Sequence, residues 1–404
     1  MTNIEDFNYN LPDSQIARYP VTPRDSSKLL VYNSGGINTD HYYNLPNHLP
    51  VDSLLIINNS KVIEARLHFR KPTGGQVEIF CLEHSAIYPD IASAMQQKAR
   101  VEWICQVGGL KKWRAGSVEL PFEHNGITHT LYAEQLERLD SGFNIHFHWT
   151  APELCFSEIL HIAGKIPLPP YLNRDVEESD KHTYQTVYAQ ADGSVAAPTA
   201  GLHLTEDLFA ALRKKQIFRA TLTLHIGAGT FKPVKTNIAE DHSMHSEFIE
   251  VRQELLEVLL QKPEQTRIAV GTTSLRTLES LYWMGVKLIQ DPELKLENLQ
   301  LTQWEAYSLP QEFMFAEAIQ AVLTQVRKEG CDQFLSKTSL MIKPGYRIRS
   351  VDAILTNFHQ PKSTLLLLIH AFVGNDWKKI YDYALANNYR FLSYGDGSLL
   401  WLNK

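Results

Sequence analysis

The middle of the chain concentrates residue types that can exchange protons or bind a metal ion. These residues are His203, His225, Asp241, His242, His245 and Glu247. Histidine titrates near neutrality and therefore serves as a general acid or base. A zinc site needs further ligands at a matching spacing, and no third ligand follows His242 and His245 at helical spacing. We interpret the histidines as acid–base candidates, with a metal-dependent hydrolase as the weaker alternative.

Polar loops follow several strand-like apolar runs, and each loop leads into a helix-like segment. Residues 54–57 precede Asn58 and Asn59, residues 268–270 precede the Gly-Thr-Thr-Ser run at 271–274, and residues 353–355 precede the loop 356–363. Ligands bind at the carboxyl ends of parallel strands, where helix N-termini offer free N–H groups to anions. Helix capping alone also explains the serines in these loops, so the functional interpretation depends on their recurrence.

Two further runs have the small residues that let a backbone approach a ligand closely. The first is VAAPTAGLH at 195–203, and the second is HIGAGTF at 225–231, directly after an alternating apolar run. A tight turn explains the first run equally well. The second lacks the GxGxxG spacing that leads into a helix with a later acidic residue, so the sequence does not support a Rossmann dinucleotide site.

The elements that must position these loops show two different sequence patterns. Between Arg66 and Thr150 the runs 76–82, 101–107, 117–120, 127–132 and 143–149 are short and β-prone, which predicts a small antiparallel barrel or sandwich. Outside them strand-like and helix-like runs alternate, including a helix over 206–215 and a strand over 218–226. Alternation of this kind predicts an α/β domain with parallel strands, into which the all-β part is inserted.

Composition and charge limit the class of protein. The chain has 404 residues and a net charge of -6, which excludes a generally basic wrapper of nucleic acid. Residues 208–239 and 334–351 contain no Asp or Glu but several Lys and Arg, so RNA phosphates would be held locally. Trp113, among basic residues, is a candidate for stacking on a base.

Cysteine spacing and apolar runs indicate the compartment. The four cysteines form no CxxC pair, which favours neither a disulfide framework nor a zinc ribbon. The N-terminal residues are polar where a signal peptide would be apolar, and the longest apolar run is too short to span a bilayer. We therefore expect a cytoplasmic protein with no membrane partner.

Taken in order along the chain, these motifs resemble the S-adenosylmethionine:tRNA ribosyltransferase-isomerases of queuosine synthesis. The matching segments are 57–63, 65–67, 73–75, 167–171, 184–189, 195–203, 225–231, 270–274, 355–359 and 393–396. The resemblance implies a barrel-like α/β domain over 1–66 and 151–404, with a β-barrel domain inserted at 67–150. It implies transfer and isomerisation of the ribosyl group of S-adenosylmethionine onto 7-aminomethyl-7-deazaguanine at the tRNA wobble position, which gives epoxyqueuosine and releases adenine and methionine.

The resemblance also implies partners and site residues. S-adenosylmethionine is a consumed co-substrate, so no separate cofactor and no metal ion are expected, and the other partner is the tRNA anticodon region. His203, His225 and Asp396 are the expected proton-transfer groups. The expected substrate-binding residues are Asn58, Asn59, Arg66, Thr199, Gly201, Thr272, Thr273, Ser274, Asn357, Phe358, His359 and Tyr394. Thr272, Thr273 and Ser274 are expected to hold the methionine carboxylate, and Phe358 and Tyr394 to face the sulfonium.

The chain departs from the usual pattern of the family at several positions. They are Glu64, Phe69, Leu204, Lys343 and Gln360. The segment 285–337 is also longer than the family needs. A diverged paralogue that binds RNA or a nucleotide without catalysing the transfer is therefore the alternative function.

Overall fold

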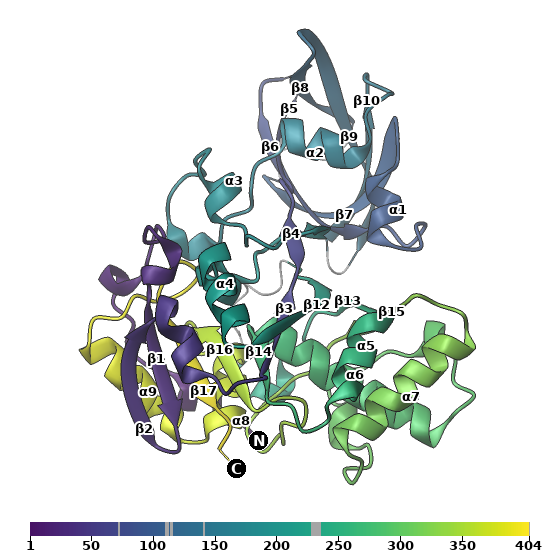
Figure 1. The fold of residues 1–404 in the computed structure, drawn as a ribbon. Coiled ribbons are helices and arrows are strands. Elements are labelled where there is room, and N and C mark those ends of the chain that lie inside the picture. The colour runs from purple at the N-terminus through teal and green to yellow at the C-terminus, as the bar shows by residue number, and fades with distance from the viewer. Residues whose placement is uncertain (72, 110–112, 114–115, 140–141, 228–235, 404) are drawn as a thin grey trace.

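The chain folds into an α/β body that carries a separate β-barrel (Figure 1). The computed structural model describes residues 1–71, 73–109, 113, 116–139, 142–227 and 236–403. Both termini lie on the side of the α/β body away from the barrel (Figure 1). The expected class, α/β with an inserted antiparallel β-barrel, is confirmed by this architecture, while the α/β body, expected to be barrel-like, is built on a large mixed sheet.

The α/β body is built on a nine-stranded mixed sheet. Its spatial order is β15 (Gln333–Thr338), β13 (Glu247–Arg252), β12 (Phe218–His225), β3 (Leu54–Asn58), β14 (Arg267–Val270), β16 (Ala353–Asn357), β17 (Gly397–Trp401), β1 (Lys28–Asn33) and β2 (Gly36–His41). The central strands β12, β3, β14 and β16 run parallel, as the alternating texture predicts. On one side β13 and β15 continue the sheet in antiparallel fashion, and on the other β17 is antiparallel to β16.

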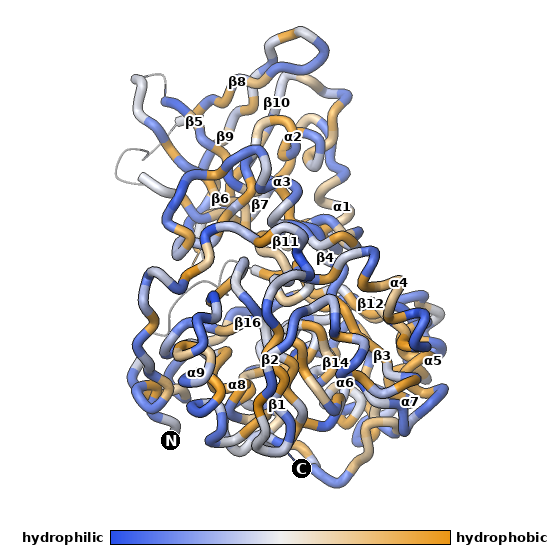
Figure 2. Tube along the Cα trace, turned by 60° about the vertical axis from the view of Figure 1, so that its left-hand side comes forward, coloured by the Kyte–Doolittle hydropathy of each residue, from blue (hydrophilic) through white to orange (hydrophobic). Residues whose placement is uncertain are grey.

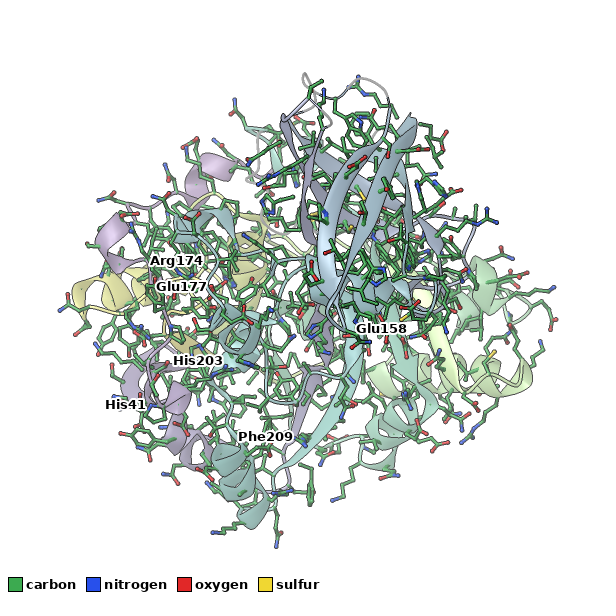
Figure 3. All side chains as sticks on the ribbon, turned by 90° about the horizontal axis from the view of Figure 1, so that it is seen from above. His41, Glu158, Arg174, Glu177, His203 and Phe209 are labelled. Atoms are coloured by element: carbon green, nitrogen blue, oxygen red, sulfur yellow. The ribbon has the colours of Figure 1, made fainter. Side chains whose placement is uncertain are left out.

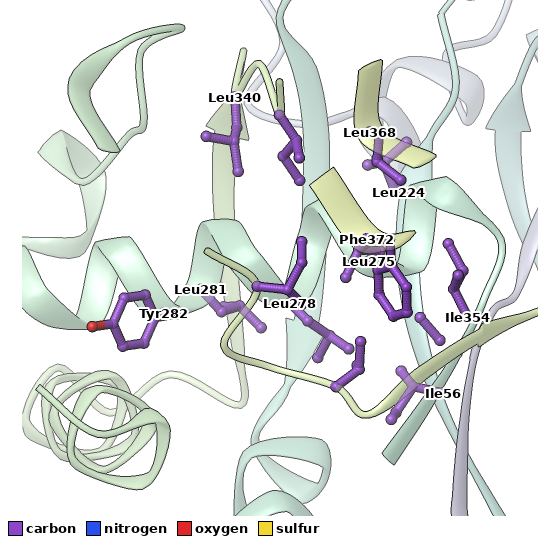
Figure 4. Close-up of a cluster of buried hydrophobic side chains, with 14 of the residues drawn as sticks. Ile56, Leu224, Leu275, Leu278, Leu281, Tyr282, Leu340, Ile354, Leu368 and Phe372 are labelled. Atoms are coloured by element: carbon purple, nitrogen blue, oxygen red, sulfur yellow. The ribbon is translucent and has the colours of Figure 1, made fainter. Parts of the chain in front are cut away.

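Both faces of this sheet are buried. Successive side chains of a strand point to opposite faces, so the residues of one strand divide between two cores. In β3, Leu54 and Ile56 join the core that contains the helices α5 (Gln253–Gln261), α6 (Thr272–Gln290), α7 (Phe315–Lys328), α8 (Thr364–Val373) and α9 (Asp376–Ala386). Leu55 and Ile57 join a second core with helix α4 (Glu206–Lys214) and the 3-10 helix Tyr42–His48. Figure 4 shows Ile56 in the first of these cores, near Ile354 and Phe372.

Six antiparallel strands close into the barrel, which decides between the two expected all-β architectures. The order is β10 (Gly142–Trp149), β7 (Arg100–Gly108), β6 (Gln76–His84), β5 (Arg66–Arg70), β8 (Val118–His124) and β9 (Ile127–Leu139). Phe69, Trp103 and Phe147 fill the interior, and helices α1 (Ile91–Met95) and α2 (Phe156–Ala163) pack against it. Closure gives each of these six described strands a neighbour on both sides.

The prediction that Trp113 stacks on a base is wrong. Its side chain is 1% exposed, and its indole Nε1 donates a hydrogen bond of 2.9 Å to the carbonyl of Gly116. The neighbouring Lys111, Lys112 and Arg114 lie outside the described residues. A buried indole belongs to the barrel core and offers no face to RNA.

The chain enters and leaves the barrel at one place. It enters through β4 (Ser60–Val62), which pairs in parallel with β11 (Ala191–Ser194). Arg66 and Lys165 then exchange two backbone hydrogen bonds of 3.1 and 2.9 Å across the crossing. A side-chain carbon on Gly164 would lie 1.9 Å from the carbonyl oxygen of Glu64, so only glycine allows the two segments to pass this closely.

The late segment 285–337 extends the α/β body. It contains the end of α6, the whole of α7, and most of β15. A side-chain carbon on Gly285 would lie 2.1 Å from the carbonyl oxygen of Ala318, so α6 and α7 are in direct backbone contact.

Hydropathy follows this architecture. Figure 2 shows the apolar segments gathered inside both bodies and the polar ones at their surfaces. Among the helices of the described residues, none has both the length and the apolarity to cross a bilayer.

Candidate functional site

A pocket lies where β14 and β16 end and their chains turn toward helices. We call it the strand-end pocket, and it has about 100 Å³ of free volume. Its lining residues are Tyr171, 196–200, Ile226, 271–273, 356–360, Ser363, Leu365, Leu392 and Ser393. Six of the predicted substrate-binding residues are among them: Thr199, Thr272, Thr273, Asn357, Phe358 and His359.

Two helix N-termini open into the strand-end pocket. Helix α6 begins at Thr272 and helix α8 at Thr364, with Ser363 as its N-cap residue. The hydroxyl oxygens of Thr273 and Ser363 are buried and have no hydrogen-bond partner among the described residues. Free N–H groups and the positive ends of two helix dipoles favour an anion at such a place.

A hydrogen-bonded chain connects the strand-end pocket to His203. Thr199 donates a hydrogen bond of 2.8 Å to the side-chain oxygen of Asn357, and the Asn357 amide lies 3.3 Å from Nε2 of His203. On the other side, Nδ1 of His203 lies 3.0 Å from the hydroxyl of Ser27. Since the amide donates to Nε2, the proton of the neutral ring is on Nδ1 and faces Ser27.

His203 is held neutral inside the α/β body. Burial, followed by the positive charge of Arg390, lowers the pKa of His203 to about 3. The ring stacks on Tyr42 with centroids 4.3 Å apart. It lines a small hollow with Tyr394 and does not line the strand-end pocket. Figure 3 shows His203 in the α/β body, well apart from Glu158 of helix α2.

His225 lies in a larger cavity between the barrel and the sheet, which we call the interdomain cleft. The cleft has a volume of about 700 Å³. It is lined by residues 82–84, 89–91, Gln106, Gly193, 225–227, 244–250, 296–297, 299–300 and 335–337. Burial, followed by the nearby His84, lowers the pKa of His225 to about 4. Ile226 lines both cavities, so the interdomain cleft and the strand-end pocket adjoin.

Asp396 is occupied by backbone donors. Its two carboxylate oxygens accept hydrogen bonds from the N–H groups of Lys28, at 2.9 Å, and Arg390, at 2.8 Å. The side chain is 2% exposed and lines neither the strand-end pocket nor the interdomain cleft. These contacts join β1 to the turn before β17, so the Asp396 carboxylate holds two segments of the fold together.

Three predicted binding residues also lie elsewhere. The Asn58 side chain bonds the carbonyl of Leu224 at 3.0 Å and accepts from the N–H groups of Ser60 and Leu224. Asn59 accepts a hydrogen bond from Thr223 at 2.7 Å. Arg66 lies on the barrel and forms an ion pair of 2.7 Å with Glu78.

The remaining predicted residues, Gly201, Ser274 and Tyr394, do not line the strand-end pocket. A side-chain carbon on Gly201 would lie 1.8 Å from the hydroxyl of Tyr188, so glycine is required there. Ser274 donates to the carbonyl of Val270, the last residue of β14, at 2.8 Å. Tyr394 donates to Asp180 at 3.1 Å, which leaves its phenol turned away from the strand-end pocket.

The predicted basic stretches are spread over the described surface. Lys337 lines the interdomain cleft, whereas Lys343 forms an ion pair of 3.0 Å with Glu240. Arg349 stacks over Trp283 at 5.0 Å. Residues 228–235, which include the end of the HIGAGTF run, lie outside the described residues. A tRNA surface formed by these stretches stays a prediction.

Several residues that line the cavities were not predicted as site residues. Ser363 is one, although its place before an apolar helical run is a capping signal. His84, Asp90, Phe248 and Glu250 of the interdomain cleft are the others of interest, and no local sequence pattern distinguishes them. Among the described residues, no group of three His, Cys, Asp or Glu side chains is arranged to hold a metal ion.

The chain is similar to known proteins over nearly its whole length. Residues 4–400 match the family described as "Queuosine biosynthesis protein". A solved structure of S-adenosylmethionine tRNA ribosyltransferase from Thermotoga maritima is 26% identical, with 98% of this chain and 99% of that chain covered and a TM-score of 0.46. Because the family match covers nearly the whole chain, the protein belongs to the queuosine biosynthesis protein family.

Proposed function

We propose that this protein transfers and isomerises the ribosyl moiety of S-adenosylmethionine onto 7-aminomethyl-7-deazaguanine at the tRNA wobble position. The product is epoxyqueuosine in the tRNA anticodon, and adenine and methionine leave. S-adenosylmethionine is consumed as a co-substrate, and the reaction as implied by the family resemblance uses no metal ion. The observation that carries the proposal is the convergence of predicted residues from three distant segments, 199, 272–273 and 357–359, on the strand-end pocket.

The strand-end pocket is suited to the carboxylate of the methionine part. The N-termini of α6 and α8 meet there, and the free hydroxyls of Thr273 and Ser363 add two donors. Its volume of about 100 Å³ is enough for the end of the ligand only. The ribosyl and adenine parts therefore extend past Ile226 into the interdomain cleft, whose volume of about 700 Å³ is typical of ligand sites.

His225 is the best-placed base of the three predicted catalytic residues. The reaction needs removal of a proton from the 5′-carbon of the ribose, which the adjacent sulfonium acidifies. His225 lines the interdomain cleft beside Ile226, and its Nδ1 has no hydrogen-bond partner among the described residues. Its lowered pKa keeps the ring neutral at physiological pH, so a lone pair is available to accept the proton.

His203 acts through Asn357 and is a positioning residue. Its ring accepts from the Asn357 amide, and Asn357 in turn holds Thr199 at the wall of the strand-end pocket. Loss of the ring would free Asn357 to rotate, so the affinity for S-adenosylmethionine would fall more than the rate of the bound complex. The effect of His203→Ala is therefore expected mainly in KM and that of His225→Ala mainly in kcat.

The function is tested by incubating the protein with S-adenosylmethionine and tRNA that carries 7-aminomethyl-7-deazaguanine. Release of free adenine and the mass gain of the modified nucleoside are expected together. Binding of both substrates without adenine release would contradict the proposal and favour a paralogue that only binds RNA or a nucleotide.

The carboxylate site has a separate test. Thr273→Val and Ser363→Ala each remove a hydroxyl at a helix start, and the affinity for S-adenosylmethionine is expected to fall about three- to tenfold. The matched control is Thr277→Val, because the Thr277 hydroxyl bonds the carbonyl of Thr273 inside α6 and does not line the pocket. An equal loss in the control would place the effect in helix stability rather than in binding.

A further inference from the structure

The ring of His359 connects the wall of the strand-end pocket to helix α9. His359 lies in the loop between β16 and α8, is 8% exposed, and lines the strand-end pocket together with Thr356. Its Nδ1 lies 3.4 Å from the hydroxyl of Tyr381, and its Nε2 lies 3.3 Å from the hydroxyl of Thr356. We call Tyr381, His359 and Thr356 the hydrogen-bond relay.

Tyr381 lies behind the strand-end pocket and does not line it. The residue is 2% exposed, and its ring packs edge-to-face against Phe358 and Tyr9, with centroids 5.5 and 5.2 Å apart. Its hydroxyl oxygen accepts a hydrogen bond of 3.0 Å from the backbone N–H of His359. Among the described residues, both hydrogen-bond contacts of this hydroxyl are therefore with His359.

The backbone contact decides which ring nitrogen of His359 carries the proton. Burial lowers the pKa of His359 to about 3 and raises the pKa of Tyr381, so the ring is neutral and the phenol keeps its proton. If Nδ1 carried the ring proton, the Tyr381 oxygen would accept twice, and its own O–H would have no acceptor among the described residues. A buried O–H without an acceptor is costly, so Tyr381 donates to Nδ1 and the ring proton is on Nε2.

The position of this proton gives the direction of the contact at Thr356. With its proton on Nε2, the His359 ring donates to the Thr356 hydroxyl oxygen. The Thr356 O–H then has no acceptor among the described residues and can donate to a ligand in the strand-end pocket. In the reverse direction the Thr356 O–H would donate to Nε2, and the hydroxyl would offer a ligand only a lone pair, which repels an anion.

We propose that Tyr381 is a positioning residue of the strand-end pocket, which sets the direction of the hydrogen-bond relay so that the Thr356 hydroxyl donates to the carboxylate of the ligand. The inference rests on the proposed function, in which this pocket takes the carboxylate of S-adenosylmethionine. Thr356 adds a third hydroxyl donor to those of Thr273 and Ser363. Tyr381 itself touches no ligand and acts through His359 alone.

The test compares a ligand that has the carboxylate with one that lacks it, in the full-length protein. S-adenosylmethionine has it, whereas 5′-methylthioadenosine shares the adenosine and the sulfur but lacks the amino-acid part. In calorimetry, Tyr381→Phe is expected to bind S-adenosylmethionine about three- to tenfold more weakly than the wild type and 5′-methylthioadenosine within about twofold of it. An equal loss for both ligands would overturn the proposal, as would an unchanged affinity for S-adenosylmethionine.

Tyr389→Phe is the matched control, because it removes a buried hydroxyl from the same aromatic cluster. The Tyr389 ring lies 5.6 Å from Phe358, but its hydroxyl donates to Thr39 at 2.8 Å and belongs to no cavity wall described above. Its affinity for S-adenosylmethionine is expected to stay within about twofold of the wild type. A loss as large as that of Tyr381→Phe would overturn the proposal, since any buried hydroxyl of the cluster would then matter equally.

Tyr9→Phe separates the direction of the relay from the position of His359. The Tyr9 hydroxyl donates to the backbone carbonyl of His359 and does not contact its ring. Its removal is expected to leave the affinity for S-adenosylmethionine within about twofold of the wild type. A loss as large as that of Tyr381→Phe would overturn the proposal, because the position of His359 would then determine the affinity.

A double variant tests whether Tyr381 acts through Thr356. Thr356→Val removes the hydroxyl at nearly constant shape, and adding Tyr381→Phe to it is expected to change the affinity for S-adenosylmethionine by less than about twofold. Losses that multiply would overturn the proposal, because the two hydroxyls would then act independently. In Tyr381→Phe alone the KM for S-adenosylmethionine should rise, whereas kcat should stay unchanged because the residue contacts no reacting atom.

Failure of this inference can be distinguished from failure of the proposed function. A wild type whose affinity for S-adenosylmethionine falls in Tyr381→Phe but which releases no adenine contradicts the transfer and supports the relay. Adenine release by the wild type with an unchanged affinity in Tyr381→Phe supports the transfer and contradicts the relay.

Discussion

At the scale of single residues, similar sequence contexts led to different environments. The three residues predicted as proton-transfer groups, His203, His225 and Asp396, all lie in segments that match the family pattern. Asp396 is saturated by two backbone donors, and His203 is bonded at both ring nitrogens. Those partners are supplied by segments far away in the chain, such as Ser27 and Asn357. A local motif does not contain that information.

His225→Ala is expected to lower the rate of adenine release by about 10²- to 10⁴-fold while the affinity for S-adenosylmethionine stays within about twofold, because a general base is lost. Single-turnover adenine release measures the rate. Since the pKa of His225 lies at about 4, the wild-type rate should not fall through protonation of this ring until the pH approaches that value.

His182→Ala is the control for this variant, because His182 is exposed and lines neither the strand-end pocket nor the interdomain cleft. A full rate in His225→Ala would remove it from the mechanism. A full rate of the bound complex in His203→Ala is expected of a positioning residue, whereas a rate that falls as far as in His225→Ala would give His203 a part in the proton transfer.

Gly201→Ala is expected to destabilise the protein by about 1–3 kcal/mol, because the new methyl group overlaps the Tyr188 hydroxyl. Thermal or urea unfolding measures the change. Tyr188→Phe in the same chain removes the overlapping oxygen and should recover part of the loss. No recovery in the double variant would mean that another neighbour, such as Thr186, sets the constraint.

At the scale of elements, periodicity predicted much of the fold. The predicted helix 206–215 is α4 (Glu206–Lys214), and the alternating run 218–226 is β12. Strand β5 was not recognised, because every second residue is charged or polar. Arg66, His68 and Arg70 make its sequence look like that of a loop. The antiparallel pairing of β13 with β12 and β15 was not predicted either, since strand partners are set by contacts distant in sequence.

Asn58→Ala is expected to lower the free energy of unfolding by about 2–3 kcal/mol, because it leaves buried backbone groups of Leu224 and Ser60 without partners. Here the residue joins β3 to β12 and is not expected to touch substrate. A stable variant with a weakened affinity for S-adenosylmethionine would restore the binding role that the sequence predicts.

At the scale of the whole molecule, the interdomain cleft is the feature that sequence reasoning could not reach. Its walls come from the barrel at 82–84 and 89–91, from β12 and β13, and from 296–297, 299–300 and 335–337. Each segment is ordinary by itself, and only the docking of the barrel on the sheet brings His84 next to Phe248, with ring centroids 5.1 Å apart. The strand-end pocket was predictable because the parallel strands of a sheet end on one side.

Glu250→Gln is expected to stabilise the unliganded protein at neutral pH and to have no effect in acid. A carboxyl whose pKa is raised in the fold binds its proton more tightly there, so stability is lost as the pH rises from the ordinary carboxyl pKa through the raised one. The groups around Glu250 are Arg252 on its own strand, His225 on β12, Lys337 on β15, and Asp90 and His84 from the barrel.

Melting temperatures of wild type and variant, measured between about pH 4 and about pH 8, test this expectation across the range in which carboxyl groups titrate. The difference should grow with pH and then level off. Glu153→Gln, which removes an exposed carboxylate outside the cleft, should show no such trend. A difference that shrinks as the pH rises would mean that the Glu250 carboxylate is stabilised in the fold by a cation of the protein.

The backbone bridge between Arg66 and Lys165 makes the barrel removable. Its entering and leaving strands are hydrogen-bonded neighbours, so a turn of a few residues could join them after deletion of the segment between. The shortened chain would keep the sheet and the strand-end pocket but lose the barrel side of the interdomain cleft. The point of insertion thus separates the part of the chain that forms the strand-end pocket from the part that completes the interdomain cleft.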